Sequence, residues 1–266
     1  MCKRLKLRVH EKIMENKNFE RETLIKLNDL SKVYEENPIF SRINCDISRG
    51  DFICVVGPSG SGKTTLLRCL LGVEKISSGF IYQESDSIRF TYVPQQPTLL
   101  PWRSALENVV SGIFPGVSNP KKQAFEILKL VGLAGKEHAL PRLLSGGMQQ
   151  RVSFARALAS APDIVFMDEP FSALDEMRRV ELVRLVFDLW QKSGVTFVMN
   201  THSIEDASIL STKVWIMGPA KDRAVGASLR VLHTWPRTES LDSRKASNTQ
   251  ATIRAEIERE ISMVAV

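Results

Sequence analysis

A glycine-rich loop between an apolar segment and a helical segment constrains this chain more than any other feature. The loop matches the pattern GxxxxGKT in full and reads Gly57, Pro58, Ser59, Gly60, Ser61, Gly62, Lys63, Thr64. Its glycines allow the backbone to wrap so that successive amide groups face phosphate oxygens. The helix that follows adds the positive end of its dipole. The loop therefore predicts a site for the phosphates of a nucleotide.

Two side chains at the end of this phosphate loop (residues 57–64) suit a triphosphate and its metal. Lys63 supplies an ammonium for the β- and γ-phosphates, and the Thr64 hydroxyl is a ligand for Mg²⁺. The structural alternative is a strand-to-helix turn with a chance lysine. The apolar strand expected before the loop and the helix expected after it disfavour that alternative. The loop, followed by Thr65, is accordingly expected to bind ATP with Mg²⁺.

A pair of carboxylates at the end of a second apolar strand is an independent feature. The segment 163–170 contains Asp168 and Glu169 after four apolar residues. Two carboxylates at a strand end are costly unless they meet a cation. Asp168 is therefore expected to hold Mg²⁺ through its water shell, and Glu169 to polarise the attacking water. A polar turn is the alternative for this pair alone, but the phosphate loop favours hydrolysis.

Strand-like and helix-like segments alternate along most of the chain. Strands are expected at 24–30, 33–36, 51–57, 79–81, 88–93, 163–170, 195–200 and 212–217, and helices at 64–71, 105–110, 121–131, 148–159, 176–192, 204–210 and 252–263. The alternation predicts an α/β fold, a P-loop NTPase core with a parallel sheet. We also expect an N-terminal antiparallel β subdomain and an inserted helical subdomain. The expected parts are a basic tail at 1–22, an ATPase domain at 23–220 with its helical subdomain at about 97–160, and an extension at 221–266.

Composition limits the setting of the chain. Of its 266 residues, 43% are hydrophobic and 25% are charged, which is ordinary for a globular protein. No apolar run reaches the roughly 18 residues of a membrane span, and the first 22 residues lack the apolar core of a secretory signal. The four cysteines have no CxxC spacing, which favours reduced thiols and a cytosolic setting. The net charge of +6 is compatible with a phosphate ligand, anionic lipid or nucleic acid.

A third motif, LSGGMQQR at residues 144–151, stands at the start of an expected helix. Ser145 is a natural cap for that helix, and Gly146 and Gly147 leave backbone amides uncovered. Such a helix end binds phosphate. Because the chain already has its own phosphate loop, the second anion site suits the ATP of another subunit and predicts a head-to-tail dimer. A capped helix with a glycine turn is the alternative for this motif alone.

These motifs closely resemble those of the ATP-binding subunits of ABC transporters. The resemblance covers roughly residues 24–218 in the family's order, and LSGGMQQR followed by VSFARALA looks like its signature motif. The family usually has Gln where Met148 stands. The resemblance implies ATP hydrolysis coupled to transport. It also implies a dimer that buries each ATP between the phosphate loop of one subunit and Ser145, Gly146, Gly147 and Met148 of the other.

The resemblance implies roles for residues outside these motifs. Tyr34 stands where the family stacks an aromatic ring on adenine. His202 matches the histidine that contacts the γ-phosphate and aligns Glu169. The family often has Asp where Ser203 stands. Residues 172–175 match the segment that touches the opposite subunit.

One glutamine is assigned from the same resemblance. Gln95 matches the residue that reaches Mg²⁺ and the γ-phosphate and reports to the membrane partner. Gln96 is adjacent, and Gln95 is preferred because it falls six residues before Pro101. The family's usual aromatic residue before this glutamine is replaced by Pro94.

Residues 99–109 resemble the nitrate/sulfonate/taurine importer group through LLPW and ENV. Trp102, with Leu99 and Leu100, is expected to line a groove for the coupling helix of a separate permease. Packing within the helical subdomain is the alternative. The resemblance implies a peripheral subunit at the cytoplasmic face of the membrane. Its implied partners are a second copy of the chain, the permease and, indirectly, a solute-binding protein.

Other classes of P-loop protein are weaker alternatives. A soluble ABC-type ATPase acting on nucleic acid or ribosomes usually carries two cassettes or long inserted domains. This chain has one cassette, without zinc ligands or a coiled-coil insertion. A small-molecule kinase would have no use for the LSGGM helix or His202. No nucleic-acid partner is therefore expected, and the transported solute stays open.

Overall fold

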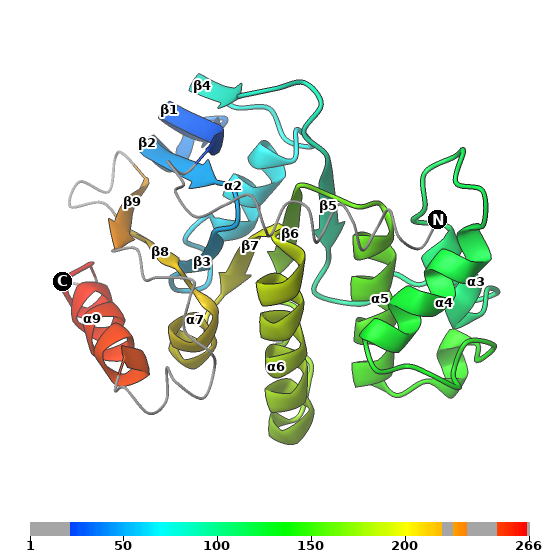
Figure 1. Cartoon of the computed structure of the whole chain (residues 1–266). Coiled ribbons are helices and arrows are strands. Elements are labelled where there is room, and N and C mark those ends of the chain that lie inside the picture. The colour runs from blue at the N-terminus through cyan, green and yellow to red at the C-terminus, as the bar shows by residue number, and fades with distance from the viewer. Residues whose placement is uncertain (1–21, 220–225, 233–248, 265–266) are drawn as a thin grey trace. The chain divides into compact units, whose positions relative to one another are not determined.

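The computed structural model describes residues 22–219, 226–232 and 249–264 (Figure 1). These residues form two compact units. Arg89–Val195 is called the helical unit below, and the described segments before and after it together are called the sheet unit. The basic tail expected at 1–22 lies outside the described residues except for Glu22, and so does part of the C-terminal extension.

The sheet unit contains seven strands and three helices among its described residues. The strands are β1 (Thr23–Tyr34), β2 (Asn37–Ser48), β3 (Phe52–Val56), β4 (Ser78–Gln83), β7 (Thr196–Thr201), β8 (Lys213–Pro219) and β9 (Ala227–Leu232). The helices are α2 (Lys63–Leu70), α7 (Ile204–Leu210) and α9 (Thr249–Val264). The strand order is β4-β1-β2-β9-β8-β3-β7. β1 pairs antiparallel with β2 and β4, whereas β3 runs parallel to β7 and β8, so the predicted parallel and antiparallel parts are both present.

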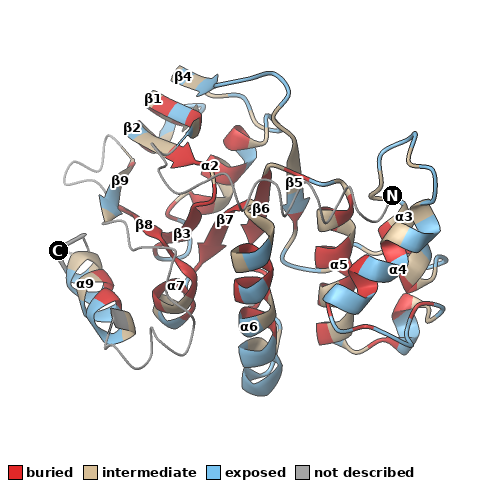
Figure 2. Ribbon diagram, viewed as in Figure 1, coloured by how far each residue is buried: buried red, intermediate tan, exposed pale blue. Residues whose placement is uncertain are grey.

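The centre of this sheet is fully buried. Every residue of β3 and β7 is buried, and both strands are red in Figure 2. Parallel strands that are covered on both faces have continuous apolar sequences, which is why the sequence predicts β3. The rings of Phe52 and Phe197 stack between the two strands with centroids 5.3 Å apart. This packing of β3 against β7 fixes the ends of the two strands, which the phosphate loop and His202 follow directly.

The antiparallel part differs from the sequence prediction. β1 is one strand of 12 residues where the sequence indicates two segments. Asp29 has a φ of 48°, and the register shifts between Leu27 and Leu30, so a bulge interrupts the alternation and makes one strand look like two. β2 and β9 are not predicted, because their burial patterns lack a clean two-residue period. Pairing with neighbouring strands defines both of them.

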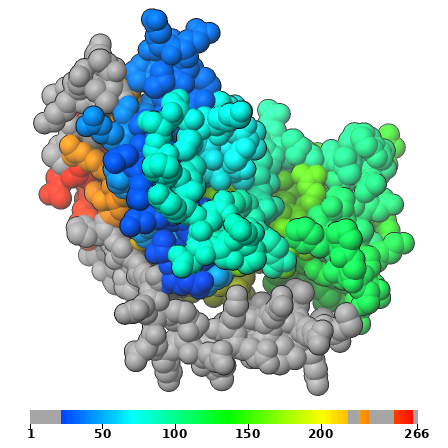
Figure 3. Space-filling view, turned by 90° about the horizontal axis from the view of Figure 1, so that it is seen from above, coloured from blue at the N-terminus to red at the C-terminus, as the bar shows by residue number. Residues whose placement is uncertain are grey.

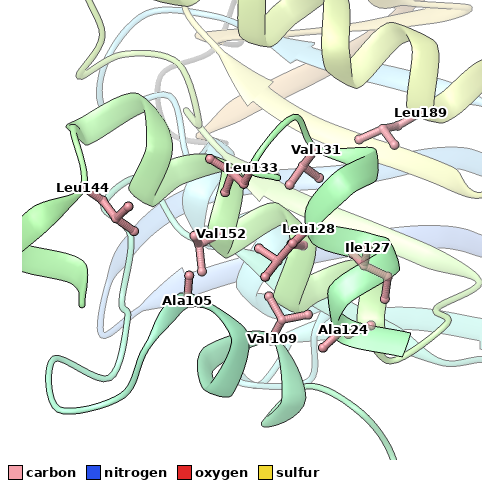
Figure 4. Close-up of a cluster of buried hydrophobic side chains, with 12 residues drawn as sticks. Ala105, Val109, Ala124, Ile127, Leu128, Val131, Leu133, Leu144, Val152 and Leu189 are labelled. Atoms are coloured by element: carbon pink, nitrogen blue, oxygen red, sulfur yellow. The ribbon is translucent and has the colours of Figure 1, made fainter. Parts of the chain in front are cut away.

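The helical unit contains two parallel strands and the helices packed with them. Its elements are β5 (Phe90–Val93), α3 (Ala105–Val110), α4 (Pro120–Leu130), the 3₁₀ helix η1 (Pro141–Leu143), α5 (Gly146–Ala159), β6 (Ile164–Asp168) and α6 (Glu176–Ser193). The α-helices agree with the prediction to within two residues, whereas η1 is not predicted. Val109, Leu128 and Val152, from three helices, meet in one apolar cluster (Figure 4). This unit is larger than the helical subdomain predicted at 97–160, because it also contains β5, β6 and α6. The boundaries of the subdomain itself therefore stay a prediction.

Lys213 forms an ion cluster with Asp46 and Asp51 in the sheet unit, in which Lys213 and Asp51 are buried and Asp46 is partly exposed. The Lys213 ammonium lies 2.8 Å from an Asp46 oxygen and 2.9 Å from an Asp51 oxygen. Lys213 is 7% exposed and Asp51 is 3% exposed. Burial opposes the charged forms, but the hydrogen bond and charge of the partner prevail: the pKa of Asp46 is lowered and the pKa of Lys213 is raised. The charged Lys213–Asp46 pair therefore stabilises the folded chain.

Lys213→Met should lower the free energy of unfolding by about 3 kcal/mol, because it leaves the Asp51 carboxylate buried without its cation. Urea denaturation at pH 7 measures the change. Lys26→Met, which removes an exposed lysine of β1, is the matched control and should change the free energy by less than about 0.5 kcal/mol.

The same comparison has an expected pH dependence. Because the pKa of Asp46 is lowered on folding, its contribution is present above the unfolded value near about 4 and is lost as the pH falls through the folded value. The stability difference between the wild type and Lys213→Met should shrink in that acid range. A variant as stable as the wild type at pH 7 would contradict the assignment.

Candidate functional site

The phosphate loop joins the carboxyl end of β3 to the first turn of α2. Lys63 is folded over this loop, and its Nζ donates to the carbonyl oxygens of Gly57 at 2.8 Å and Pro58 at 2.9 Å. Gly62 is the N-cap of α2, and no side chain caps the helix there. The loop therefore combines an ammonium with a helix N-terminus, which is the combination that binds phosphate.

The surroundings of the loop require two of its glycines. A Cβ on Gly57 would lie 2.0 Å from the carbonyl oxygen of Met217 in β8. Gly62 has a φ of 90°, and a Cβ there would lie 2.8 Å from Cγ2 of Ile39 in β2. The Ser61 hydroxyl between them is buried and has no hydrogen-bond partner among the described residues. Buried polar groups are normally paired, so this hydroxyl fits a site for a polar ligand.

His202 and the phosphate loop both follow the carboxyl ends of neighbouring parallel strands. The last residues of β3 and β7 are register partners, and the next residues along the chain are Gly57 and His202. Ligands of α/β sheets bind at the carboxyl ends of parallel strands. Ser203, which stands where the related family often has Asp, caps α7 by accepting the amide of Asp206 at 3.1 Å. Ser203 therefore performs the capping that an Asp could perform.

Tyr34 is the last residue of β1 and is 38% exposed. Its register partner is Asn37 at the start of β2. Ile39, two residues further along β2, is the side chain next to Gly62. The hairpin end that carries Tyr34 therefore lies beside the phosphate loop, as a ring that stacks on a nucleotide base requires.

In the helical unit, the two predicted carboxylates follow one another at the end of β6. Asp168 is the last residue of the strand and is 9% exposed. Glu169 has a φ of 45°, a left-handed conformation that costs a non-glycine residue about 1–2 kcal/mol. Backbone strain of this kind concentrates at functional sites. Its presence at Glu169 supports a functional reading of the turn.

Gln95 is connected to this turn through Ser172. Gln95 Nε2 donates to Ser172 Oγ at 3.1 Å, and Ser172 Oγ donates to the carbonyl oxygen of Glu169 at 2.9 Å. The contact supports Gln95 rather than Gln96 as the glutamine of the site. The sequence gives no signal for the Ser172 link, because 77 positions separate Ser172 from Gln95.

Ser145 caps α5, as the sequence predicts. Its hydroxyl accepts the Met148 amide at 3.3 Å. Gly147 is buried with Arg178 Cδ 3.5 Å from the position of a Cβ, whereas Gly146 is exposed and has nothing within 4 Å of that position. The start of this 14-residue helix is therefore accessible to a ligand on the Gly146 side.

The predicted site residues fall into two groups. The group in the sheet unit comprises Tyr34, residues 57–65 and His202. The group in the helical unit comprises Gln95, Ser145, Gly146, Gly147, Met148, Asp168 and Glu169. Across the described parts of the chain, no three or more His, Cys, Asp or Glu residues gather as metal ligands. None of the described helices has the length and apolar character needed to cross a membrane.

Comparisons with known proteins agree on one family. A family model described as "ABC transporter" matches residues 40–172. A taurine import ATP-binding protein of Rhizobium johnstonii is 40% identical over 225 residues, with 81% of this chain and 86% of that protein covered. An aliphatic sulfonates import ATP-binding protein of Pseudomonas syringae pv. tomato is 37% identical over 197 residues, with 74% and 71% covered.

A solved structure extends these comparisons to the fold. It is described as a dimeric, post-hydrolysis ATP-binding cassette bound to ADP and Pi. The similarity has a TM-score of 0.67 and 30% identity, and covers 80% of this chain and 100% of that one. The predicted fold class and the resemblance to the importer group are confirmed by these matches.

Gly57→Ala should destabilise the chain, because the added methyl group would overlap the Met217 carbonyl oxygen. We expect the free energy of unfolding to fall by about 2–3 kcal/mol, as for other overpacked sites. Urea denaturation measures it. Gly146→Ala is the matched control, since its methyl group meets nothing within 4 Å. Equal loss of stability in both variants would refute the close approach of β8 to the loop.

Proposed function

The chain belongs to the ABC transporter family of ATP-binding subunits and is an ATPase, and from this premise we propose that it powers solute import through a separate membrane permease. The observation that carries the proposal is the phosphate loop, in which Lys63 and an uncapped helix N-terminus lie together. The relatives named for taurine and aliphatic sulfonates import support a solute of the nitrate/sulfonate/taurine type. They do not favour an ATPase that acts on nucleic acid.

The nucleotide is ATP with Mg²⁺. Adenine stacks on Tyr34, and the phosphates lie on the amides of the phosphate loop with the Lys63 ammonium between the β- and γ-phosphates. Oxygen ligands from Thr64, Gln95 and Asp168 suit Mg²⁺, which prefers hard donors and takes few protein ligands besides substrate phosphates. When bound, Mg²⁺ neutralises charge on the β- and γ-phosphate oxygens.

Glu169 and His202 carry out the hydrolysis. The Glu169 carboxylate orients the attacking water and takes its proton, while His202 contacts the γ-phosphate and aligns Glu169. The turn at Glu169 is held by Ser172, whose backbone amide and hydroxyl both donate to the Glu169 carbonyl oxygen, at 3.2 Å and 2.9 Å. This double contact supports the role, because a positioned base needs a fixed backbone.

Two copies of the chain act together. The start of α5, with Ser145, Gly146, Gly147 and Met148, contacts the nucleotide bound by the other copy, and residues 172–175 touch that copy. The similar cassette described as dimeric supports this arrangement. The subunit sits at the cytoplasmic face of the membrane, where Trp102, 72% exposed, anchors the permease. A solute-binding protein is an indirect partner of the assembly.

Glu169→Gln should bind ATP, accumulate as an ATP-bound dimer and lose at least about 100-fold in turnover, because an amide cannot accept the proton of water. Phosphate release gives the turnover, and gel filtration with ATP gives the dimer. Glu84→Gln, at an exposed position after β4, is the matched control and should turn over normally. Near-native turnover of Glu169→Gln would refute the assigned role.

Trp102→Ala should weaken assembly with the permease by at least about tenfold, since exposed aromatic anchors carry much of an interface's binding energy. Turnover of the subunit alone should stay within about twofold. Co-purification of the subunit with its permease measures the assembly. Leu130→Ala, another exposed apolar side chain, is the control. Equal recovery of Trp102→Ala and the wild type would place the permease contact elsewhere.

A further inference from the structure

We propose that Lys32 is a positioning residue for the nucleotide base: its ammonium, held by Glu74, fixes the Tyr34 ring against which adenine stacks. The inference rests on the proposed role of Tyr34 in the ATP site. It adds a specific means by which the chain prepares that ring before the nucleotide arrives.

The Lys32 ammonium is held at three points. Its Nζ lies 4.2 Å from the centroid of the Tyr34 ring, 2.8 Å from Glu74 Oε1 and 2.8 Å from the carbonyl oxygen of Lys75. Lys32 is 6% exposed, which is rare for a lysine. A cation within about 6 Å of a ring centroid is attracted to the ring face. One face of Tyr34 is therefore occupied by a fixed charge.

Glu74 keeps the Lys32 ammonium ionised beside the ring. The pKa of Lys32 is raised, chiefly by its hydrogen bond to Glu74. The pKa of Glu74 is lowered, chiefly by the hydrogen bond from Lys32. The lysine and glutamate are thus both charged at neutral pH. Tyr34 is therefore held at its ring face by the Lys32 ammonium, and Glu74 fixes that ammonium in place.

The segment that carries Glu74 is itself fastened to β1. The Ser77 amide donates to the Ser31 carbonyl oxygen at 2.9 Å, and the Ser77 hydroxyl accepts the amide of Val33 at 2.9 Å. In Figure 3, cyan residues of this region of the chain lie against the blue residues of the first strands. Together with Lys32, these bonds tie three successive residues of β1 to this segment, directly before Tyr34.

The same segment is continuous with the phosphate-binding helix. α2 begins at Lys63, and the amides of Val73 and Glu74 donate to the Arg68 carbonyl oxygen in its last turns. The phosphate loop therefore leads into the first turn of α2, and Glu74, which holds Lys32 beside the ring, follows its last turn. The Lys32–Glu74 pair links this segment to β1, the strand that carries Tyr34.

A held ring binds a base better than a free one. Tyr34 is exposed at a strand end, and ordering an exposed side chain on binding costs free energy that a pre-positioned one avoids. The ammonium also draws electron density from the ring and so reduces repulsion between stacked π faces. Both effects act on the base and neither acts on the phosphates. Loss of Lys32 should therefore reduce affinity for ATP without reducing affinity for a triphosphate that has no base.

The test is calorimetric titration of the full chain with ATP and with inorganic tripolyphosphate, each with Mg²⁺. Lys32→Met should raise the Kd for ATP about three- to tenfold and leave the Kd for tripolyphosphate within about twofold. Lys26→Met, an exposed lysine on the same strand, should change neither value. Equal weakening of both ligands, or no weakening of ATP, would overturn the proposal.

Tyr34→Leu distinguishes the role of Lys32 from the base-stacking role of Tyr34 itself. The single variant should weaken ATP about tenfold, and adding Lys32→Met to it should weaken ATP no further. A further loss in the double variant would show that Lys32 acts other than through the ring. Should Tyr34→Leu bind ATP normally, the base-stacking role itself fails. Should Lys32→Met not fold, Glu74→Gln gives the same comparison, and it must also weaken ATP selectively.

Discussion

The neutralisation of triphosphate charge by one short loop is the interaction on which the rest of this structure depends. The loop can wrap around phosphate only because Gly57 lies against the backbone of β8 and Gly62 adopts a left-handed conformation. Lys63 then has its ammonium among the loop carbonyl oxygens. The buried strands β3 and β7 provide the rigid edge from which this loop and His202 begin. The buried apolar strands thus hold the polar residues at the sheet edge in fixed positions.

In the function proposed above, the two units contribute different parts of the chemistry. The groups proposed for the nucleotide, which are the loop, His202 and the ring of Tyr34, belong to the sheet unit. Asp168, Glu169 and the helix end at Ser145 belong to the helical unit. Glu169 has a left-handed backbone conformation, and Ser172 donates to its carbonyl oxygen, so contacts within the turn after β6 hold this position. Hydrolysis, in the account proposed here, uses that position to direct water.

The sequence predicts the parts of this protein that local patterns encode. The phosphate loop, the strand that ends at Asp168 and the Ser145 cap could be recognised because each depends on a few adjacent residues and on the apolar strand or helix beside them. β2 and β9 could not, since pairing with distant strands defines them. The same limit applies to the contacts of Lys32 with Glu74 and of Gln95 with Ser172, which join residues 42 and 77 positions apart. Short-range patterns carry no information about such contacts.

In the proposed function, Lys63 and the loop amides hold the phosphates of ATP. Calorimetric titration of Lys63→Ala with ATP and Mg²⁺ measures the contribution of the lysine. We expect a Kd at least about tenfold above that of the wild type, because one charge-assisted contact to phosphate is lost. An unchanged Kd in a folded variant would show that Lys63 does not hold the phosphates.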